Sequence, residues 1–183
     1  MSDILGNNAP NYYSEENAKL YELSGAFKRI QESMAADALS IGDFEPDSFV
    51  LDMGCGTGFS LNVLKKFGFR AVGIDASFEM LKYAKGKKFE VILADMAYLP
   101  FKDESFDNLI SISAIQWADA QKYGKVLDEI KRVIKKGAIV QFYPKEKKEF
   151  DYFFSLSKKR FRVSQVFLVG QGVKAKKYIK LKK

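Results

Sequence analysis

The feature that most constrains this sequence is a glycine-rich run directly after a short apolar segment. Apolar residues occupy positions 49–51, and the pattern D-x-G-x-G-x-G covers residues 52–58. Glycines in such a pattern let the backbone turn tightly and approach a ligand closely. The apolar segment therefore predicts the end of a buried strand, and Phe59 to Phe67 predict the helix that follows the turn.

Two acidic residues follow further apolar segments downstream of the glycine run. Asp75 ends the second segment about 20 residues after the glycines, and Asp95 follows the third. An acidic residue at the C-terminal end of the second strand is placed to hydrogen-bond a ribose diol. We therefore expect a ligand that carries a ribose. The alternative is a glycine-rich turn with no ligand.

Apolar periodicity predicts alternating strands and helices after an N-terminal helical segment. Residues 12–41 predict two helices, the first capped by Ser14 and the second running from Ala26 to Ile41. The alternation beyond them is typical of a parallel α/β sheet. Its strands are expected at 48–53, 70–75, 89–94, 106–113 and 138–143, and its helices at 59–67, 77–86, 121–135 and 146–158.

The last part of the chain changes pattern. Val163–Val169 and Lys176–Leu181 are strand-like runs with no helix between them, separated by the turn Gly170-Gln171-Gly172. They predict a terminal β-hairpin. Together with the five earlier strands, the hairpin predicts a seven-stranded α/β sheet that is mostly parallel.

Length and composition suit a single domain. The chain has 183 residues, 47% of them hydrophobic, which is enough for a sizeable core. We expect one domain over 1–183, with residues 1–44 as a helical segment that closes the site and residues 45–183 as the α/β core. No stretch approaches the roughly 18 apolar residues that a membrane span needs, so no membrane partner is expected.

Cysteine and histidine content restrict the chemistry. Cys55 is the only cysteine, which excludes an internal disulfide and a cysteine metal cluster, so we expect no metal site and a cytoplasmic protein. The chain has no histidine, which removes the usual general base near neutral pH. Any reaction must therefore use carboxylates, tyrosines, lysines or backbone groups, or need no base.

Charge is unevenly distributed along the sequence. Residues 1–134 hold 15 Lys or Arg and 20 Asp or Glu, whereas residues 135–183 hold 15 and 3, giving net charges of −5 and +12. A basic C-terminal part favours a phosphate-rich partner such as RNA, and the alternative is a solubilising lysine surface. Six aromatic residues among these charges are candidates for base stacking or for the core: Tyr143, Phe150, Tyr152, Phe153, Phe154 and Phe161.

The glycine run and the two acids resemble the motifs of class I S-adenosylmethionine-dependent methyltransferases. A dinucleotide-binding loop would have the spacing G-x-G-x-x-G instead. The resemblance implies a Rossmann-like fold with S-adenosylmethionine as cofactor, Asp95 on the adenine amine and Met96 packed on the adenine ring. The cofactor-binding residues that it implies are Asp52, Gly54, Cys55, Gly56, Gly58, Asp75, Ala76, Asp95, Met96 and Ser111.

The segment after the fourth strand is expected to receive the methyl acceptor. It reads S-I-S-A-I-Q-W over 111–117 and has no N-P-P-Y or D-P-P-Y, the motifs of enzymes that methylate exocyclic amines. Cys55 lies in the wrong loop for methylation of a pyrimidine carbon. Direct attack by a nitrogen with an in-plane lone pair, such as guanine N7, needs no base. Gln116, Trp117 and Tyr143 are the residues expected to form the catalytic acceptor pocket.

Three segments resemble the eukaryotic small-subunit (18S) ribosomal RNA guanine-N7 methyltransferases: residues 111–117, Q-F-Y-P-K at 141–145, and Tyr12-Tyr13-Ser14. The resemblance implies that the chain takes part in rRNA methylation and processing and that it binds RNA of the small ribosomal subunit and not DNA. It also implies a partner, a small zinc-binding activator protein. That protein would pair with the apolar edge strand 89–94. Tyr12 and Tyr13 are expected to close the site over cofactor and base.

Two other functions stay open at this stage. A small-molecule methyltransferase, acting on a quinone or lipid precursor, would share every cofactor motif without needing the basic segment. A noncatalytic ribosome-assembly factor could keep the fold and hold the cofactor as a structural ligand. Salt dependence separates RNA binding from small-molecule turnover, because contacts to phosphates weaken steeply as salt rises.

Overall fold

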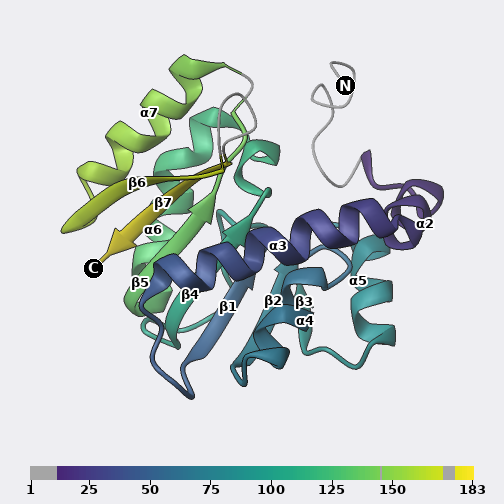
Figure 1. Ribbon diagram of the computed structural model, residues 1–183. Coiled ribbons are helices and arrows are strands. Elements are labelled where there is room, and N and C mark those ends of the chain that lie inside the picture. The colour runs from purple at the N-terminus through teal and green to yellow at the C-terminus, as the bar shows by residue number, and fades with distance from the viewer. Residues whose placement is uncertain (1–11, 145, 171–175) are drawn as a thin grey trace.

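The computed structural model describes residues 12–144, 146–170 and 176–183. Two N-terminal helices precede a seven-stranded sheet whose strand order is β3-β2-β1-β4-β5-β7-β6 (Figure 1). The strands are β1 (Phe49–Met53), β2 (Arg70–Asp75), β3 (Val91–Leu93), β4 (Phe106–Ile112), β5 (Ile134–Gln141), β6 (Val163–Val169) and β7 (Lys176–Lys182). The helices are α2 (Glu15–Leu23), α3 (Gly25–Gly42), α4 (Phe59–Lys66), α5 (Phe78–Gly86), α6 (Tyr123–Val133) and α7 (Lys147–Lys158).

The sheet has the predicted strand directions. Strands β1 to β5 pair in parallel, and β7 is antiparallel to both β5 and β6. The predicted fold class, a mostly parallel sheet of seven strands with a terminal antiparallel hairpin, is confirmed. Of the predicted hairpin turn, Gln171 and Gly172 lie outside the described residues.

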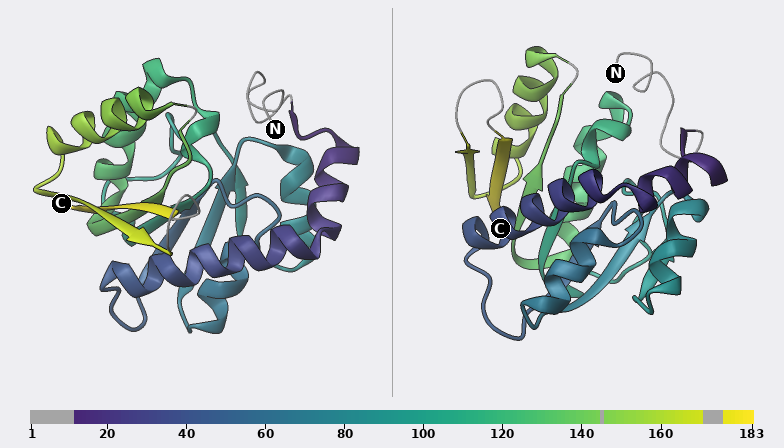
Figure 2. Two further views of the ribbon diagram at one scale, coloured as in Figure 1. Left: turned by 45° about the horizontal axis from the view of Figure 1, so that its top comes forward. Right: turned by 45° about the vertical axis from the view of Figure 1, so that its right-hand side comes forward.

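Helices cover both faces of the sheet (Figure 2). Helices α3, α4 and α5 pack on one face around an apolar cluster that includes Met34, Leu64 and Tyr178. Helices α6 and α7 pack on the other face around a second cluster that includes Tyr123 and Phe153. Because both faces of the central strands are covered, β1 and β4 are almost entirely buried, as expected for a parallel sheet. No helix among the described residues is long and apolar enough to cross a membrane.

Serine side chains set where the N-terminal helices begin. The Ser14 hydroxyl accepts the backbone N–H of Asn17, which makes it the predicted cap of α2. Ser24 ends α2, and its hydroxyl accepts the N–H of Phe27 at the start of α3. A single residue therefore joins the two helices, and α3 begins one residue before the predicted Ala26.

The largest differences from the predicted element boundaries lie at the junction of α6 and β5 and at β3. The predicted helix 121–135 ends at Val133, and β5 begins at Ile134 rather than at 138. Ile134 is extended and pairs with Phe106, and the next two residues, both lysines, point outward to carboxylates. Basic residues are typical of the last turn of a helix, so the sequence of this part of the strand resembled a helix end. The third strand is also short, covering three residues of the predicted 89–94.

The fold brings the basic C-terminal part against acidic residues from earlier in the chain. Lys180 lies 2.6 Å from Asp43, and Lys136 lies 2.6 Å from Glu45. Comparable pairs are Lys135 with Asp107, Arg160 with Asp128, Lys176 with Asp37 and Lys183 with Glu104. Much of the charge asymmetry along the sequence is therefore compensated in space.

Candidate active site

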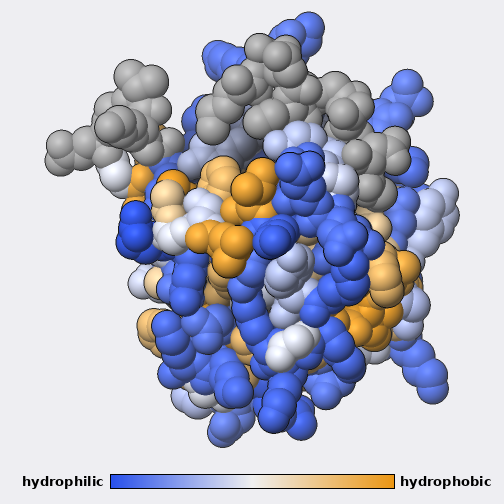
Figure 3. All heavy atoms as spheres, turned by 90° about the vertical axis from the view of Figure 1, so that its right-hand side faces the viewer, coloured by the Kyte–Doolittle hydropathy of each residue, from blue (hydrophilic) through white to orange (hydrophobic). Residues whose placement is uncertain are grey.

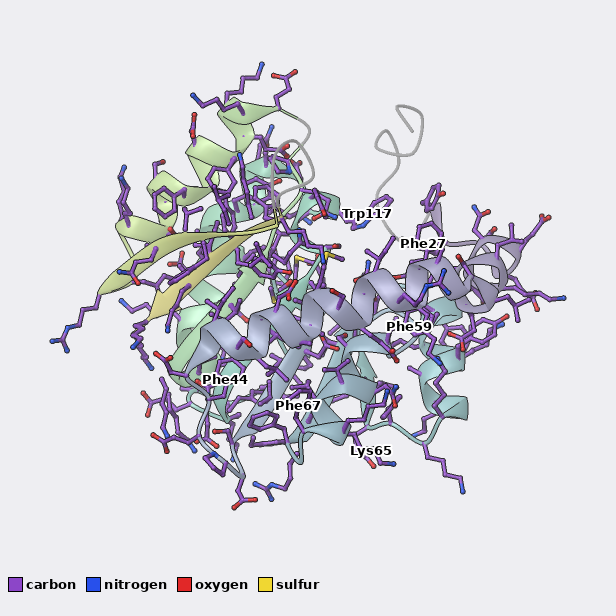
Figure 4. All side chains as sticks on the ribbon, viewed as in Figure 1. Phe27, Phe44, Phe59, Lys65, Phe67 and Trp117 are labelled. Carbon is purple, nitrogen blue, oxygen red and sulfur yellow. The ribbon has the colours of Figure 1, made fainter. Side chains whose placement is uncertain are left out.

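A cavity of about 1180 Å³ opens at the carboxyl ends of the parallel strands. Its walls come from the loops that follow β1 to β5 and from the N-terminal helices. Figure 4 labels three of its aromatic residues: Phe27 on α3, Phe59 at the start of α4, and Trp117 after β4. Ligands of open α/β sheets bind at this edge of the sheet, so the cavity is the candidate active site.

The glycine run forms the wall of the cavity beside β1. The backbone N–H groups of Gly54 and Cys55 both donate to the carbonyl of Ile74, at 2.8 Å each. Gly54 has a φ of +83°, and a Cβ built on it would lie 2.2 Å from the Cβ of Ala114. A side chain at this position would therefore collide with the loop after β4. Glycine is required because the two loops meet here.

Asp75 lies at the end of β2 and anchors the same loop. Its Oδ2 accepts the backbone N–H of Gly56 at 2.9 Å, and its Oδ1 accepts that of Ser77 at 2.8 Å. Burial raises the pKa of Asp75 above its ordinary value, although these hydrogen bonds favour the charged form. Asp75 and Ala76 both line the cavity, where the sequence predicted a contact with a ribose.

Three predicted cofactor residues lie behind the cavity wall rather than on it. Asp52 is fully buried, with one oxygen accepting the hydroxyl of Ser60. Gly58 caps α4, where a Cβ would come within 2.8 Å of the Phe89 ring. Ser111 donates from its hydroxyl to the carbonyl of Met53 at 2.8 Å, which ties β4 to β1. These residues shape the wall from behind.

Asp52 has a fully buried carboxyl group, one oxygen of which, Oδ1, has no hydrogen-bond partner among the described residues. Burial and the nearby carboxylate of Asp75 raise the pKa of Asp52 to about 7, against the hydrogen bond from Ser60. An unpaired carboxylate oxygen in a buried site favours a cationic or hydrogen-bond-donating ligand nearby.

The far wall of the cavity carries Asp95 and Met96. Asp95 is exposed, accepts the N–H of Ala97 at 2.9 Å, and lies 3.5 Å from the ammonium of Lys122. Three carboxylates line the cavity, those of Asp75, Asp95 and Asp119, and Lys122 is the one cation among its described lining residues. The cavity is therefore acidic overall.

The structure brings together the predicted acceptor residues at the other end of the cavity. Gln116, Trp117 and Tyr143 all line it. The Trp117 ring stacks on Tyr12, with centroids 5.4 Å apart and planes at 29°, and Tyr13 lies 5.5 Å from the same ring. The two tyrosines that were expected to close the site therefore lie against Trp117. Lys145, the last residue of the Q-F-Y-P-K segment, lies outside the described residues.

Several lining residues were missing from the sequence-based prediction. Tyr21 stacks on the rings of Phe27 and Phe59, which extends the aromatic wall towards the glycine run. Helix α3 contributes four lining residues: Phe27, Ile30, Gln31 and Met34. Their spacing of i, i+3, i+4 and i+7 is a helical-face signal in the sequence, but it equally describes a face packed on the core.

Ser113 was also missed, and no sequence signal marks it. It has a left-handed φ of +53°. Its N–H donates to the backbone carbonyl of Gln141, and its hydroxyl donates to Gln141 Oε1 at 2.7 Å. Its own carbonyl accepts Gln116 Nε2 at 2.8 Å. Residues on β5 and on the turn after β4 therefore hold Ser113 in place.

Comparison with known proteins agrees with this geometry. The model of a methyltransferase domain family matches residues 51–142, just over half of the chain. The chain belongs to the methyltransferase domain family. The matched segment begins just before the glycine run and ends after β5, so it contains most of the cavity wall.

Two relatives of the chain are methyltransferases whose names give different acceptors. The methyltransferase chain is 36% identical over 155 residues to the 18S rRNA (guanine(1575)-N(7))-methyltransferase of Saccharomyces cerevisiae, covering 76% of this chain and 56% of that protein. It is 43% identical over 97 residues to a malonyl-[acyl-carrier protein] O-methyltransferase of Hamiltonella defensa, covering 52% of this chain and 37% of that protein. The chain thus spans about half or less of the length of these relatives.

A solved structure shares the fold. Magnesium protoporphyrin IX methyltransferase from Synechocystis, determined with bound S-adenosylmethionine, superposes with a TM-score of 0.66 at 16% identity. The superposition covers 85% of this chain and 79% of that chain. The predicted Rossmann-like methyltransferase fold is confirmed.

Proposed function

We propose that this methyltransferase transfers a methyl group from S-adenosylmethionine to guanine N7 in small-subunit ribosomal RNA. The observation that carries the choice of cofactor is the acidic cavity. The pyrophosphate of a dinucleotide would meet the carboxylates that line the cavity, and the one cation among the described lining residues, Lys122, already lies against Asp95. A sulfonium and an ammonium group suit the same carboxylates.

The cavity residues suit the parts of this cofactor. Asp75 would accept hydrogen bonds from the ribose hydroxyls, and the backbone of Gly54, Cys55 and Gly56 leaves room for the methionine part. Asp95 would accept from the adenine amine, with Met96 against the ring. Asp52 would act from behind the wall, through the charge of its unpartnered oxygen.

When bound, S-adenosylmethionine would supply a methyl carbon on a positively charged sulfur: the guanine N7 lone pair would bond to that carbon in line as the carbon–sulfur bond breaks, which leaves S-adenosylhomocysteine and moves the positive charge to the guanine. N7 carries no proton, so no general base is required of the chain. The contribution of the protein is position and exclusion of water. Trp117, Tyr12 and Tyr13 cover the acceptor end with aromatic rings, and burial raises the pKa of the Tyr13 phenol further above its ordinary value.

Similarity to the yeast rRNA methyltransferase over 76% of this chain supports the choice of acceptor. Surface charge supports it as well. Five cations of the C-terminal part have no ion pair with the described residues: Lys147, Lys158, Lys159, Arg162 and Lys177. Most of them are exposed on or near α7 and the hairpin, where they are free to contact phosphates.

We also propose that a small zinc-binding activator protein pairs with β3. This strand lies at the edge of the sheet, and its side chains Ile92 and Leu93 are 39% and 55% exposed. Figure 3 shows the side of the molecule that lies on the right in Figure 1: the face is mostly hydrophilic, with apolar groups in its upper centre and at its right. An open edge with apolar side chains suits strand addition by a partner. A cytoplasmic location is part of the same proposal.

A small-molecule methyltransferase is the second candidate, favoured by the 43% identity to the malonyl-[acyl-carrier protein] O-methyltransferase, whose named acceptor is a small acyl group held on a carrier protein and not an RNA. Labelled S-adenosylmethionine separates the two when small ribosomal subunits and small acceptors are offered side by side. Transfer to RNA should fall steeply between roughly 50 and 200 mM salt. Transfer confined to small acceptors, without salt dependence, would support the second candidate and contradict the first.

A further inference from the structure

Gln116 has a buried hydrogen-bond acceptor that the protein leaves unused. Its Nε2 donates to the carbonyl of Ser113 at 2.8 Å. A carbonyl only accepts, so this bond fixes which end of the amide is nitrogen and which is oxygen. The Oε1 at the other end is buried and has no partner among the described residues. Buried acceptors are nearly always paired, so this one indicates a donor supplied by a ligand.

The support beneath Gln116 is rigid. Ser113 holds a left-handed backbone conformation that a serine rarely adopts. Gln141 forms two hydrogen bonds with Ser113: its backbone carbonyl accepts the Ser113 N–H, and its side-chain Oε1 accepts the Ser113 hydroxyl. Gln141 is itself fully buried. A strained residue persists when its surroundings over-determine it, and such residues gather at ligand sites. The carbonyl that orients Gln116 therefore has a fixed direction.

The surroundings indicate a planar ligand. Gln116 lines the cavity next to Trp117, whose ring already accepts a stacked ring from Tyr12. Nucleobases stack on aromatic side chains and present hydrogen-bonding groups along their edges. Because Gln116 and Trp117 line the same cavity, a base stacked on the Trp117 ring would occupy the space that Gln116 also lines.

We propose that Gln116 Oε1 accepts an N–H from the Watson–Crick edge of the acceptor base, and thereby selects guanine. This inference rests on the proposed function. Guanine carries N1–H and an exocyclic amine on that edge, and N7 lies on the opposite side of the base. Holding guanine through its donors therefore leaves N7 free for the methyl group. On the same edge adenine carries an acceptor at N1 where guanine carries N1–H, so an oxygen placed opposite N1 would face a lone pair in adenine and a donor in guanine.

The test changes the acceptor base and the Gln116 side chain, separately and together, and compares the rates of methyl transfer. RNA with guanine at the acceptor position is compared with RNA carrying inosine, which lacks the exocyclic amine, and N1-methylguanosine, which lacks N1–H. Each is assayed with the wild-type protein and with Gln116→Met, which keeps the length and removes the acceptor. Gln121→Met, on an exposed residue outside the cavity, is the matched control.

For the wild type we expect kcat/KM to fall about tenfold or more for at least one altered base. For Gln116→Met that preference should shrink to within about twofold, with unchanged affinity for S-adenosylmethionine. Transfer to guanine with no loss on either altered base would overturn the inference and leave the proposed function standing. Absence of transfer to guanine RNA would overturn both. The substrate comparison on the wild-type protein keeps the test valid if the variant fails to fold.

Discussion

Replacing Gly54 with alanine tests the claim that the glycine run and the acceptor loop are packed against each other. The new Cβ would lie 2.2 Å from the Cβ of Ala114, far inside the usual carbon contact of about 3.5–4.0 Å. Forced overpacking of this kind costs about 1–3 kcal/mol. The φ of +83° adds about 1–2 kcal/mol for any side chain. We therefore expect a loss of about 2–5 kcal/mol in the free energy of unfolding.

A second substitution separates the two contributions. Once Ala114 is also glycine, the nearest remaining atom to the new Cβ is the Cα of residue 114, at 3.6 Å, an ordinary contact. The double variant Gly54→Ala/Ala114→Gly should therefore recover the packing part, about 1–3 kcal/mol. Gly86→Ala is the control, because nothing lies within 4 Å of its Cβ, and it should stabilise by about 0.5–1 kcal/mol.

Urea unfolding followed by fluorescence provides the measurement, because Trp117 is the only tryptophan and lies at this site. The reasoning would be refuted if Gly54→Ala unfolded within about 0.5 kcal/mol of the wild type. Strict additivity of the two single substitutions would refute it equally, because it would mean that residues 54 and 114 do not touch.

Three further predictions concern the cavity. Asp75→Asn should weaken binding of S-adenosylmethionine by about tenfold or more in calorimetry, because a charged acceptor is lost; unchanged affinity would show that Asp75 does not contact the ligand. The pKa of Asp52, about 7 in the folded protein, lies above its unfolded value of about 3.9, so the folded state binds more protons and stability should fall as pH rises from about 4 to 7. Asp52→Asn should remove most of that slope in urea midpoints, with a residual slope from Asp75, and an unchanged slope would contradict the raised pKa. Tyr12→Ala should shift Trp117 emission to longer wavelength while Tyr12→Phe should not, and equal spectra for both variants would argue against the observed stacking.

Much of the fold could be predicted because its signals are local. Apolar runs ending in Asp75 and before Asp95 gave the strand ends, and the glycine spacing gave the turn after β1. The start of β5 was missed because Lys135 and Lys136 are charged, as residues at a helix end often are, and the carboxylates that pair with them lie on distant segments of the sequence. Segment charge counts cannot show such pairs.

The site was predicted less completely than the fold. Motif spacing locates the end of a strand, but it does not say which residues face the cavity, so Asp52, Gly58 and Ser111 proved to lie behind the wall. The conformation of Ser113 depends on Gln141, which lies 28 residues away, and no local pattern predicts it. Tertiary contacts of this kind decide which polar atoms remain free for a ligand.

The most direct test of the central claim is to map the methylated atom. Unmodified small-subunit RNA or subunits would be incubated with labelled S-adenosylmethionine and the protein, co-purified with any small partner, and N7-methylguanine located by chain cleavage. The account predicts label and cleavage at a single guanine. Label found only in small molecules, or no transfer despite measurable cofactor binding with the partner present, would contradict it.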